Sequence, residues 1–327
     1  MTSNTGPVDA LVTGGAGFIG SAVVEALCEA GHSVRRGVRA RADQSDAVSC
    51  NLDNVEQIRA AVEGVRLVVH AAYGDSERMV PQCSALLAAM TDMGINQIVY
   101  FSSIAVYGDG AGSIDESAPL APADAYAEAK SACEQLVRGW AQETSHPNRR
   151  ALILRPGIVY GAGSRFWIDK LGERIRAGAW GVFGEQGEGV CALVHVQDVA
   201  RVVVACFDYL ERAAGASHVA ALNVVGPDTP SWNSYFQALA AGIGVRLAEV
   251  DAPSVATRQK AAFVAKVWRR IGLPGGARAA LAPTPGEMKL FARKARYATG
   301  ALTETLGFAP NIGLEQGLRL SLPQAKT

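Results

Sequence analysis

Short apolar runs alternate with segments of helical spacing over the first half of the chain. Residues 8–13 and 33–38 predict strands, and between them residues 21–30 have helical spacing that ends at Gly31. The alternation continues with predicted strands at 47–50, 67–71, 97–102 and 151–154 and helices at 55–62, 80–93 and 126–143. Strands that alternate with helices imply one parallel sheet with right-handed crossovers. We therefore expect an α/β fold built on a doubly wound Rossmann sheet.

The pattern changes after Arg155. Glycine and aromatic residues cluster at 155–167 and 178–189, before a strand and helix at 193–210 and a strand at 222–225. From Pro227 onward the segments are mainly helical and include an amphipathic stretch at 262–271. We predict that residues 1–155 form the sheet domain, to which 191–226 return, and that 156–190 and 227–327 form a smaller, mainly helical substrate lobe.

Composition narrows the class of protein. The 327 residues are 49% hydrophobic, which excludes a disordered chain, and Lys+Arg and Asp+Glu number 31 each. A net charge of zero gives no basic field, so we expect no nucleic-acid partner. No apolar run approaches 18 residues, and the polar start lacks a signal pattern, so we expect no membrane association and a cytoplasmic protein. The six cysteines lack metal-ligand spacing and predict buried thiols and no metal site.

Four glycines follow the first predicted strand. Gly14, Gly15, Gly17 and Gly20 satisfy G-x-G-x-x-G at the start of a predicted helix. Missing side chains let a pyrophosphate approach the backbone amides, where the helix N-terminus favours an anion. The loop therefore predicts dinucleotide binding, with a purely structural tight turn as the alternative.

The second strand indicates which dinucleotide is preferred. An NAD site usually has a carboxylate at the end of this strand, about 20 residues after the loop. Val38 falls there, with Arg36, Arg39 and Arg41 around it, and a guanidinium suits a 2′-phosphate. NADP(H) is favoured and NAD(H) stays open, because these arginines can also be solvated side chains on a strand end.

Ser103, Tyr126 and Lys130 form the candidate catalytic group. Tyr126 and Lys130 are four apart on a predicted helix and share a face, while Ser103 follows a buried strand at its carboxyl end. An ammonium beside a phenol stabilises the phenolate, so we expect Lys130 to lower the pKa of Tyr126 for general acid or base work. A surface helix face is the alternative.

With these motifs the chain resembles the extended short-chain dehydrogenases/reductases, which include the NAD-dependent epimerase/dehydratase family. The resemblance rests on TGGAGFIG (13–20), HAA (70–72), VYFSSIAVYG (99–108), YAEAK (126–130), LRPGIVYGAG (154–163), LVHVQDVA (193–200) and LGFAPNIGLEQGL (306–318). It implies Ser103, Tyr126 and Lys130 as catalytic residues and a homodimer through the helix that carries Tyr126. It implies cofactor contacts from Gly14, Gly15, Gly17, Phe18, Ile19, Gly20, Arg39, Asn51, Leu52, Ala71, Ala72, Tyr126, Lys130 and Pro156, and structural roles for His195 and Asp198.

Several positions depart from the family's sugar-nucleotide enzymes. Ile158 and Cys191 stand where those enzymes commonly hold the diphosphate with Asn and Arg, although Arg165, Arg174 or Arg176 can compensate. Ile104 and Ala105 replace the acids of the dehydratases. The C-terminal part is similar to the β-hydroxysteroid dehydrogenase and dihydroflavonol reductase-like branches. The aromatic candidates for an apolar pocket, each of which can equally be lobe core, are Phe166, Trp167, Trp180, Phe183 and Trp268.

These observations predict an NAD(P)-dependent oxidoreductase that moves a hydride between the nicotinamide and a secondary alcohol or ketone of a small, non-nucleotide substrate. An NAD-dependent sugar-nucleotide epimerase is the first alternative. A non-catalytic NADP(H)-sensing binding protein is the second.

Overall fold

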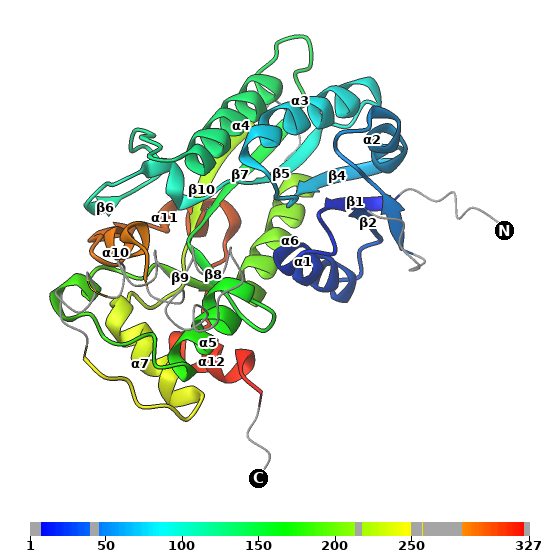
Figure 1. The fold of residues 1–327 in the computed structure, drawn as a ribbon. Helices are drawn as coiled ribbons and strands as arrows, with labels where there is room; N and C mark the ends of the chain where they lie inside the picture. Colours follow the sequence, from blue (N-terminus) through cyan, green and yellow to red (C-terminus); the bar gives the residue numbers. More distant parts are fainter. Residues whose placement is uncertain (1–7, 40–45, 213–217, 250–256, 258–282, 324–327) are drawn as a thin grey trace, which may run out of the picture.

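The computed structural model describes residues 8–39, 46–212, 218–249, 257 and 283–323. A seven-stranded parallel sheet with strand order β10-β7-β5-β4-β1-β2-β3 forms its centre (Figure 1). Its strands are β1 (Val8–Thr13), β2 (Val34–Val38), β3 (Ala47–Ser49), β4 (Val65–His70), β5 (Gln97–Phe101), β7 (Arg150–Pro156) and β10 (His218–Val224). The order reverses between β1 and β4, where a ligand crevice opens at the carboxyl ends of the strands. The predicted doubly wound sheet is confirmed.

Helices cover both faces of the sheet (Figure 1). One face carries α2 (Val55–Val62), α3 (Ser76–Asp92) and α4 (Ala125–Ala141), and the other α1 (Phe18–Glu29), α6 (Val196–Arg212) and α11 (Gly300–Leu306). Leu11 packs into the first core, whereas its neighbours Ala10 and Val12 pack into the second. Successive side chains of a strand point to opposite faces, so a strand buried on both sides is apolar throughout, as the sequence of β1 is.

Helix α3 begins four residues before the predicted start at residue 80. Asp75 caps it, because its carboxylate accepts from the Glu77 amide at 3.1 Å, and the helix continues through Pro81. The helix therefore begins at the Asp75 cap, and Pro81 lies inside it.

The strand predicted at residue 193 does not return to the main sheet. It is β9 (Leu193–His195), which pairs with β8 (Ile158–Tyr160) in a separate two-stranded parallel sheet. After residue 156, α6, β10 and α11 rejoin the main body. A second small parallel sheet, which the sequence pattern did not indicate, joins β6 (Gly112–Ile114) to β11 (Ala295–Tyr297).

A third apolar cluster lies beyond the carboxyl ends of the strands. Its elements are a π-helical turn, η2 (Arg165–Lys170), with α5 (Leu171–Arg176), α7 (Trp232–Gly242), α10 (Pro285–Phe291) and α12 (Leu314–Ser321). Short 3-10 turns, η1 (Ile104–Tyr107) and η3 (Gly184–Gly187), connect other segments. Aromatic rings dominate this cluster; Trp180, Phe236 and Phe291 meet edge to face. The amphipathic stretch predicted at 262–271, with Trp268, lies outside the described residues.

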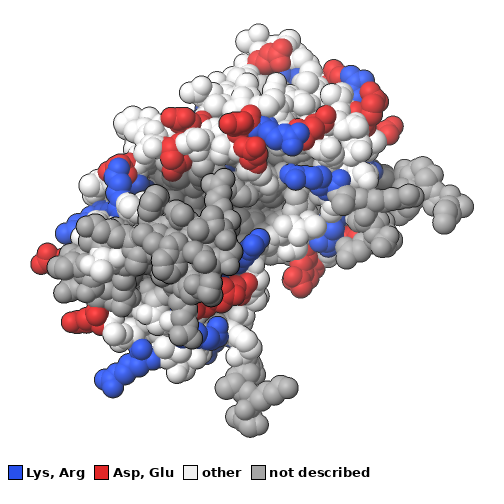
Figure 2. All heavy atoms as spheres, viewed as in Figure 1, with Lys and Arg blue, Asp and Glu red and all other residues white. Residues whose placement is uncertain are grey.

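Charged side chains of both signs are interspersed over the face seen in Figure 2. No helix in the described part of the chain is long and apolar enough to cross a membrane. Five of the six cysteines are buried as predicted, but Cys28 on α1 is exposed.

Candidate active site

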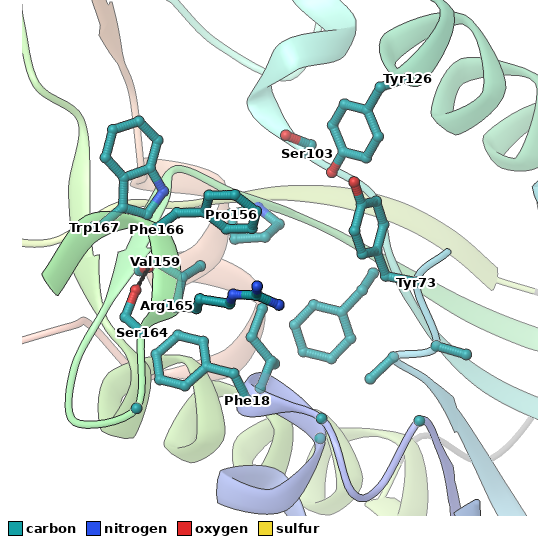
Figure 3. A pocket seen from close by; sticks show the side chains of 18 of the residues that line it. Phe18, Tyr73, Ser103, Tyr126, Pro156, Val159, Ser164, Arg165, Phe166 and Trp167 are labelled. Carbon is teal, nitrogen blue, oxygen red and sulfur yellow. Dashed lines mark hydrogen bonds between the residues drawn. The ribbon is translucent and has the colours of Figure 1, made fainter. Parts of the chain in front are cut away.

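A cavity of about 1000 Å³ lies along the carboxyl ends of the central strands (Figure 3). The glycine loop, the ends of β2, β4, β5 and β7, the start of α4, and η2 and α5 all contribute to its walls. The candidate residues that line it are Gly14, Gly17, Phe18, Ile19, Gly20, Arg39, Asn51, Leu52, Ala71, Ala72, Ser103, Tyr126, Lys130 and Pro156. One cavity therefore brings together every catalytic and cofactor-contact candidate that the resemblance implies except Gly15.

The glycine loop packs too closely for side chains. A Cβ on Gly14, which has φ +69°, would lie 2.7 Å from Ala72 Cα, and one on Gly20 would lie 2.2 Å from the Gly14 carbonyl oxygen. Helix α1 begins after Gly17 without a side-chain cap and without an acidic residue in its first turn. Amide groups at such a helix start are available to an anion. This cradle fits a dinucleotide pyrophosphate.

Gly15 faces away from the cavity. Its amide donates to the Gly37 carbonyl at 3.0 Å, and its carbonyl accepts from Arg36 Nη1 at 2.9 Å. Arg36 also bonds Asp46, so its guanidinium holds the loop and is not free for a ligand.

The turn after β4 is fixed by a buried contact between β1 and β4. Thr13 Oγ1 lies 2.7 Å from His70 Nδ1 and accepts from the Ala72 amide at 3.4 Å. Burial, together with the nearby Lys130 charge, lowers the pKa of His70 to about 3. A neutral imidazole shares a hydrogen bond with the threonine hydroxyl, and this contact orients the HAA segment against the glycine loop.

At the end of the cavity beside β2, the three predicted arginines differ in their surroundings. Arg39 lines the cavity and is exposed, whereas Arg36 is engaged elsewhere and Arg41 lies outside the described residues. Val38 is buried at the end of β2, so no carboxylate repels a 2′-phosphate there. Asn51 also lines the cavity, and its Oδ1 accepts from the Asp53 amide at 3.2 Å.

Ser103, Tyr126 and Lys130 meet at the middle of the cavity. Ser103 begins η1, and its Oγ accepts from the Ala105 amide at 3.1 Å while its hydroxyl donates to Tyr126. Tyr126 lies in the first turn of α4, which Asp124 caps through the Ala127 amide at 2.8 Å. Lys130 follows one turn later, only 4% exposed, with its Nζ 6.0 Å from the centre of the Tyr126 ring.

The expected lowering of the Tyr126 pKa by Lys130 is wrong for this structure. Burial raises the pKa of Tyr126, and the Ser103 hydrogen bond only partly offsets it. The Lys130 ammonium instead donates to the Phe101 carbonyl at 2.6 Å, and burial lowers its own pKa to about 8. The sequence showed that the two side chains share a helix face, but not that a strand-end carbonyl takes the ammonium.

Behind Lys130 lies a buried group of polar side chains. The Cys83 thiol donates to Cys133, and this hydrogen bond lowers the pKa of Cys133 to about 7. Tyr100 contacts both Cys133 and the ammonium, whose Nζ is 5.2 Å from its ring centre. Negative charge at Cys133 favours the charged form of Lys130 and opposes the effect of burial.

Sequence reasoning missed several cavity residues, and two of them, Tyr73 and Ser102, adjoin the candidate catalytic group. Tyr73, 66% exposed, packs edge-on against Tyr126 with ring centres 5.6 Å apart, and Figure 3 shows the two hydroxyls pointing toward each other. Its position directly after the HAA segment was the available signal. Ser102 is buried, lines the cavity and has an Oγ without a partner among the described residues. Its place beside Ser103 at the end of β5 could have indicated it.

The positions used to narrow the substrate lie partly in the cavity and partly in the core. Cys191 is fully buried in the third cluster, and Ile158 packs against it. Phe183 is packed in the cluster, and Arg176 is exposed and lies outside the cavity. The other candidates of this group line the cavity: Arg165, Phe166, Trp167, Arg174 and Trp180.

His195 and Asp198 lie among the packed elements and not on the cavity wall. The Asp198 carboxylate accepts from the Asn311 and Ile312 amides, at 3.2 and 2.8 Å, which ties the C-terminal segment to α6. His195 stacks edge-on against Tyr160, with ring centres 5.3 Å apart.

Comparison with known proteins shows the family. Residues 10–220 match the model of the NAD dependent epimerase/dehydratase family, so the chain belongs to this family of the extended short-chain dehydrogenases/reductases. It is 22% identical over 303 residues, 86% of the chain, to a 3beta-hydroxysteroid-dehydrogenase/decarboxylase isoform 2 of Arabidopsis thaliana, of which the match covers 52%. It is 27% identical over 237 residues, 66% of the chain, to a 2-alkyl-3-oxoalkanoate reductase of Shewanella oneidensis, of which the match covers 57%. The chain thus spans about half the length of these relatives.

Solved structures share the fold. A UDP-glucose-4-epimerase from Stenotrophomonas maltophila with bound NAD and formylated UDP-arabinopyranose has a TM-score of 0.74 at 21% identity, covering 96% of both chains. MoeE5 in complex with UDP-glucuronic acid and NAD has a TM-score of 0.72 at 22% identity, covering 96% of this chain and 97% of the other.

Proposed function

We propose that the chain is an NADP(H)-preferring oxidoreductase that moves a hydride between the nicotinamide and a secondary alcohol or ketone of a non-nucleotide substrate. The observation that carries this proposal is that Ser103, Tyr126 and Lys130 share one cavity with the glycine loop. In this proposal residues 1–155 with 191–226 hold the cofactor, and 156–190 with 227–327 supply the substrate end.

Each catalytic side chain has a role that its surroundings support. The raised pKa of Tyr126 keeps the phenol protonated at neutral pH, so it can donate its proton to a carbonyl oxygen in the reducing direction. Ser103, whose hydroxyl donates to Tyr126 in this structure, can turn it to donate to the same carbonyl oxygen when a substrate is bound. Lys130, whose ammonium is bound to the Phe101 carbonyl and does not lower the Tyr126 pKa, lies on the same helix face with its Nζ 6.0 Å from the Tyr126 ring centre, where it can bind the cofactor beside the tyrosine. A bound nicotinamide supplies or accepts the hydride.

A non-nucleotide substrate is supported by the third cluster. Cys191 is buried in this cluster and Ile158 packs against it, so neither position offers a diphosphate the polar contact that the family's sugar-nucleotide enzymes commonly have there. The reductase and dehydrogenase names of the relatives agree with a carbonyl or hydroxyl substrate. For the cofactor, Arg39 beside the buried Val38 supports NADP(H).

The test is nicotinamide absorbance with NADPH or NADH, using one panel of 3-oxosteroids and 3-oxoacyl compounds and another of UDP-sugars. We expect consumption of NADPH with members of the first panel. Interconversion of UDP-sugars with no net change in nicotinamide would refute the proposal and identify an epimerase. Binding of NADPH without turnover of either panel would refute it in favour of a sensor.

A further inference from the structure

One end of the cavity contains buried donors that lack acceptors. We call it the lobe end, the part lined by Arg174, Trp180, Phe236, Glu287 and Phe291. The Arg174 side chain is 9% exposed and Trp180 is 4% exposed. Among the described residues neither Arg174 Nε nor Trp180 Nε1 has a hydrogen-bond partner. Buried donors without acceptors are costly, and a ligand in the cavity can supply the missing oxygen.

Arg174 is held in place by neighbours that leave its Nε free. Its Nη1 donates to Glu287 Oε1 at 2.6 Å, and its guanidinium carbon lies 4.7 Å from the centre of the Trp180 ring. The other Glu287 oxygen accepts from the Thr284 amide at 2.7 Å, where it closes the capping box of α10. Both oxygens of the Glu287 carboxylate are therefore engaged. This carboxylate orients Arg174 but leaves the Arg174 Nε donor unused.

The charges on this side of the cavity favour an anion. Arg165, Lys170 and Arg174 face it, against the single carboxylate of Glu287. Figure 3 shows the Arg165 guanidinium between Pro156 and Phe18, pointing into the middle of the cavity, and Lys170 also lines the cavity. Lys170 lies one turn before Arg174, with its Nζ 5.6 Å from the Phe166 ring centre, and within the described chain it has no carboxylate partner.

We propose that the lobe end binds a carboxylate of the substrate through Arg174 Nε, Trp180 Nε1 and Lys170 Nζ. This inference rests on the proposed function, in which the reacting carbonyl lies at Tyr126. Three donors and one uncompensated cation match the two oxygens and single charge of a carboxylate better than a phosphate dianion. The walls between these anchors are aromatic, from Trp167, Phe236 and Phe291 in part, so the substrate is an oxo or hydroxy acid with an apolar body.

The experiment uses aryl oxo acids of graded chain length, each paired with its methyl ester and with the matching phosphate. Turnover is followed by nicotinamide absorbance, and binding to the NADPH-loaded protein by isothermal titration calorimetry. We expect the best acid to exceed its ester in kcat/KM, and in affinity, by about 10- to 100-fold, with the phosphate weaker than the acid.

Four variants test which side chains bind the carboxylate. Trp180→Phe keeps the ring and removes only the indole donor, and Lys170→Gln removes an exposed charge, so both are expected to fold. Arg174→Lys keeps the charge beside Glu287 but removes Nε. Each should raise KM for the acid by about tenfold while leaving the ester within about twofold, and Arg176→Gln, exposed outside the cavity, should change neither.

The outcomes separate this inference from the function on which it rests. An acid that binds in a Trp180-dependent way without being reduced supports the carboxylate site and contradicts the proposed reaction. Turnover of ketones without preference for acid over ester, in the wild type and all variants alike, overturns the carboxylate site and leaves the oxidoreductase standing. A phosphate that binds more tightly than its acid also overturns it.

Discussion

Replacing Lys130 by methionine should stabilise the cofactor-free protein near neutral pH. Burial lowers the pKa of Lys130 from 10.5 to about 8, and this difference corresponds to roughly 3 kcal/mol of destabilisation when the side chain is charged. The substitution also leaves the Phe101 carbonyl without its donor, which costs about 1–3 kcal/mol. The variant should therefore be more stable by up to about 2 kcal/mol below pH 8.

The pH dependence of this difference carries the sharper test. Between about pH 8 and 10.5 the unfolded chain keeps a proton on Lys130 that the native state has released, so wild-type stability rises with pH relative to the variant. The advantage of Lys130→Met should vanish and then reverse by about pH 10.5. Urea unfolding followed by circular dichroism at several pH values measures it, with exposed Lys170→Met as the flat control. A Lys130→Met difference that stays constant over this range would refute the reasoning.

Three further predictions concern the cofactor end. Acid should destabilise the wild type more than His70→Gln, by up to about 1.4 kcal/mol per pH unit below about pH 6.5. The reason is that the buried imidazole resists protonation in the folded protein, whereas the same imidazole in the unfolded chain does not. Urea unfolding at several pH values measures this, and equal pH profiles of the two proteins would contradict it. Gly20→Ala should abolish binding of NADPH in calorimetry because its Cβ has no room. The control Gly139→Ala, in open space on α4, should instead stabilise the protein by about 0.5–1 kcal/mol. Retained NADPH binding in Gly20→Ala would contradict this prediction. Arg39→Gln should raise the Kd for NADPH by about 10- to 100-fold and leave the Kd for NADH unchanged. The surface control Arg59→Gln should change neither Kd. An equal loss of affinity for both cofactors in Arg39→Gln would exclude a 2′-phosphate contact.

Much of the fold was predictable because its signals are local. Strands such as β1 are apolar throughout since both faces are buried, and the glycine loop needs its residues for steric reasons that hold in any such turn. The pairing of β9 with β8 was not predictable, because a three-residue apolar run is compatible with any sheet edge. Where such a strand pairs depends on contacts between distant segments.

In the candidate site, too, local features were predictable and contacts between distant residues were not. Motif spacing was sufficient to place Tyr126 and Lys130 on one helix face, and the structure brings Ser103 to them. The titration of these groups was not predictable, since it depends on burial and on the Phe101 carbonyl, which belongs to another element. The lobe-end donors were equally hidden, because the contact between Arg174 and Glu287 joins residues 113 positions apart.

The central claim is that Tyr126 is the proton donor in hydride transfer, and single-turnover mixing of the NADPH-loaded protein with a reducible ketone tests it most directly. Tyr126→Phe should bind NADPH with unchanged affinity and oxidise it at least about 100-fold more slowly than the wild type, whereas Tyr73→Phe, the matched loss of a neighbouring hydroxyl, should stay within a few-fold. Wild-type rates in Tyr126→Phe would contradict the account.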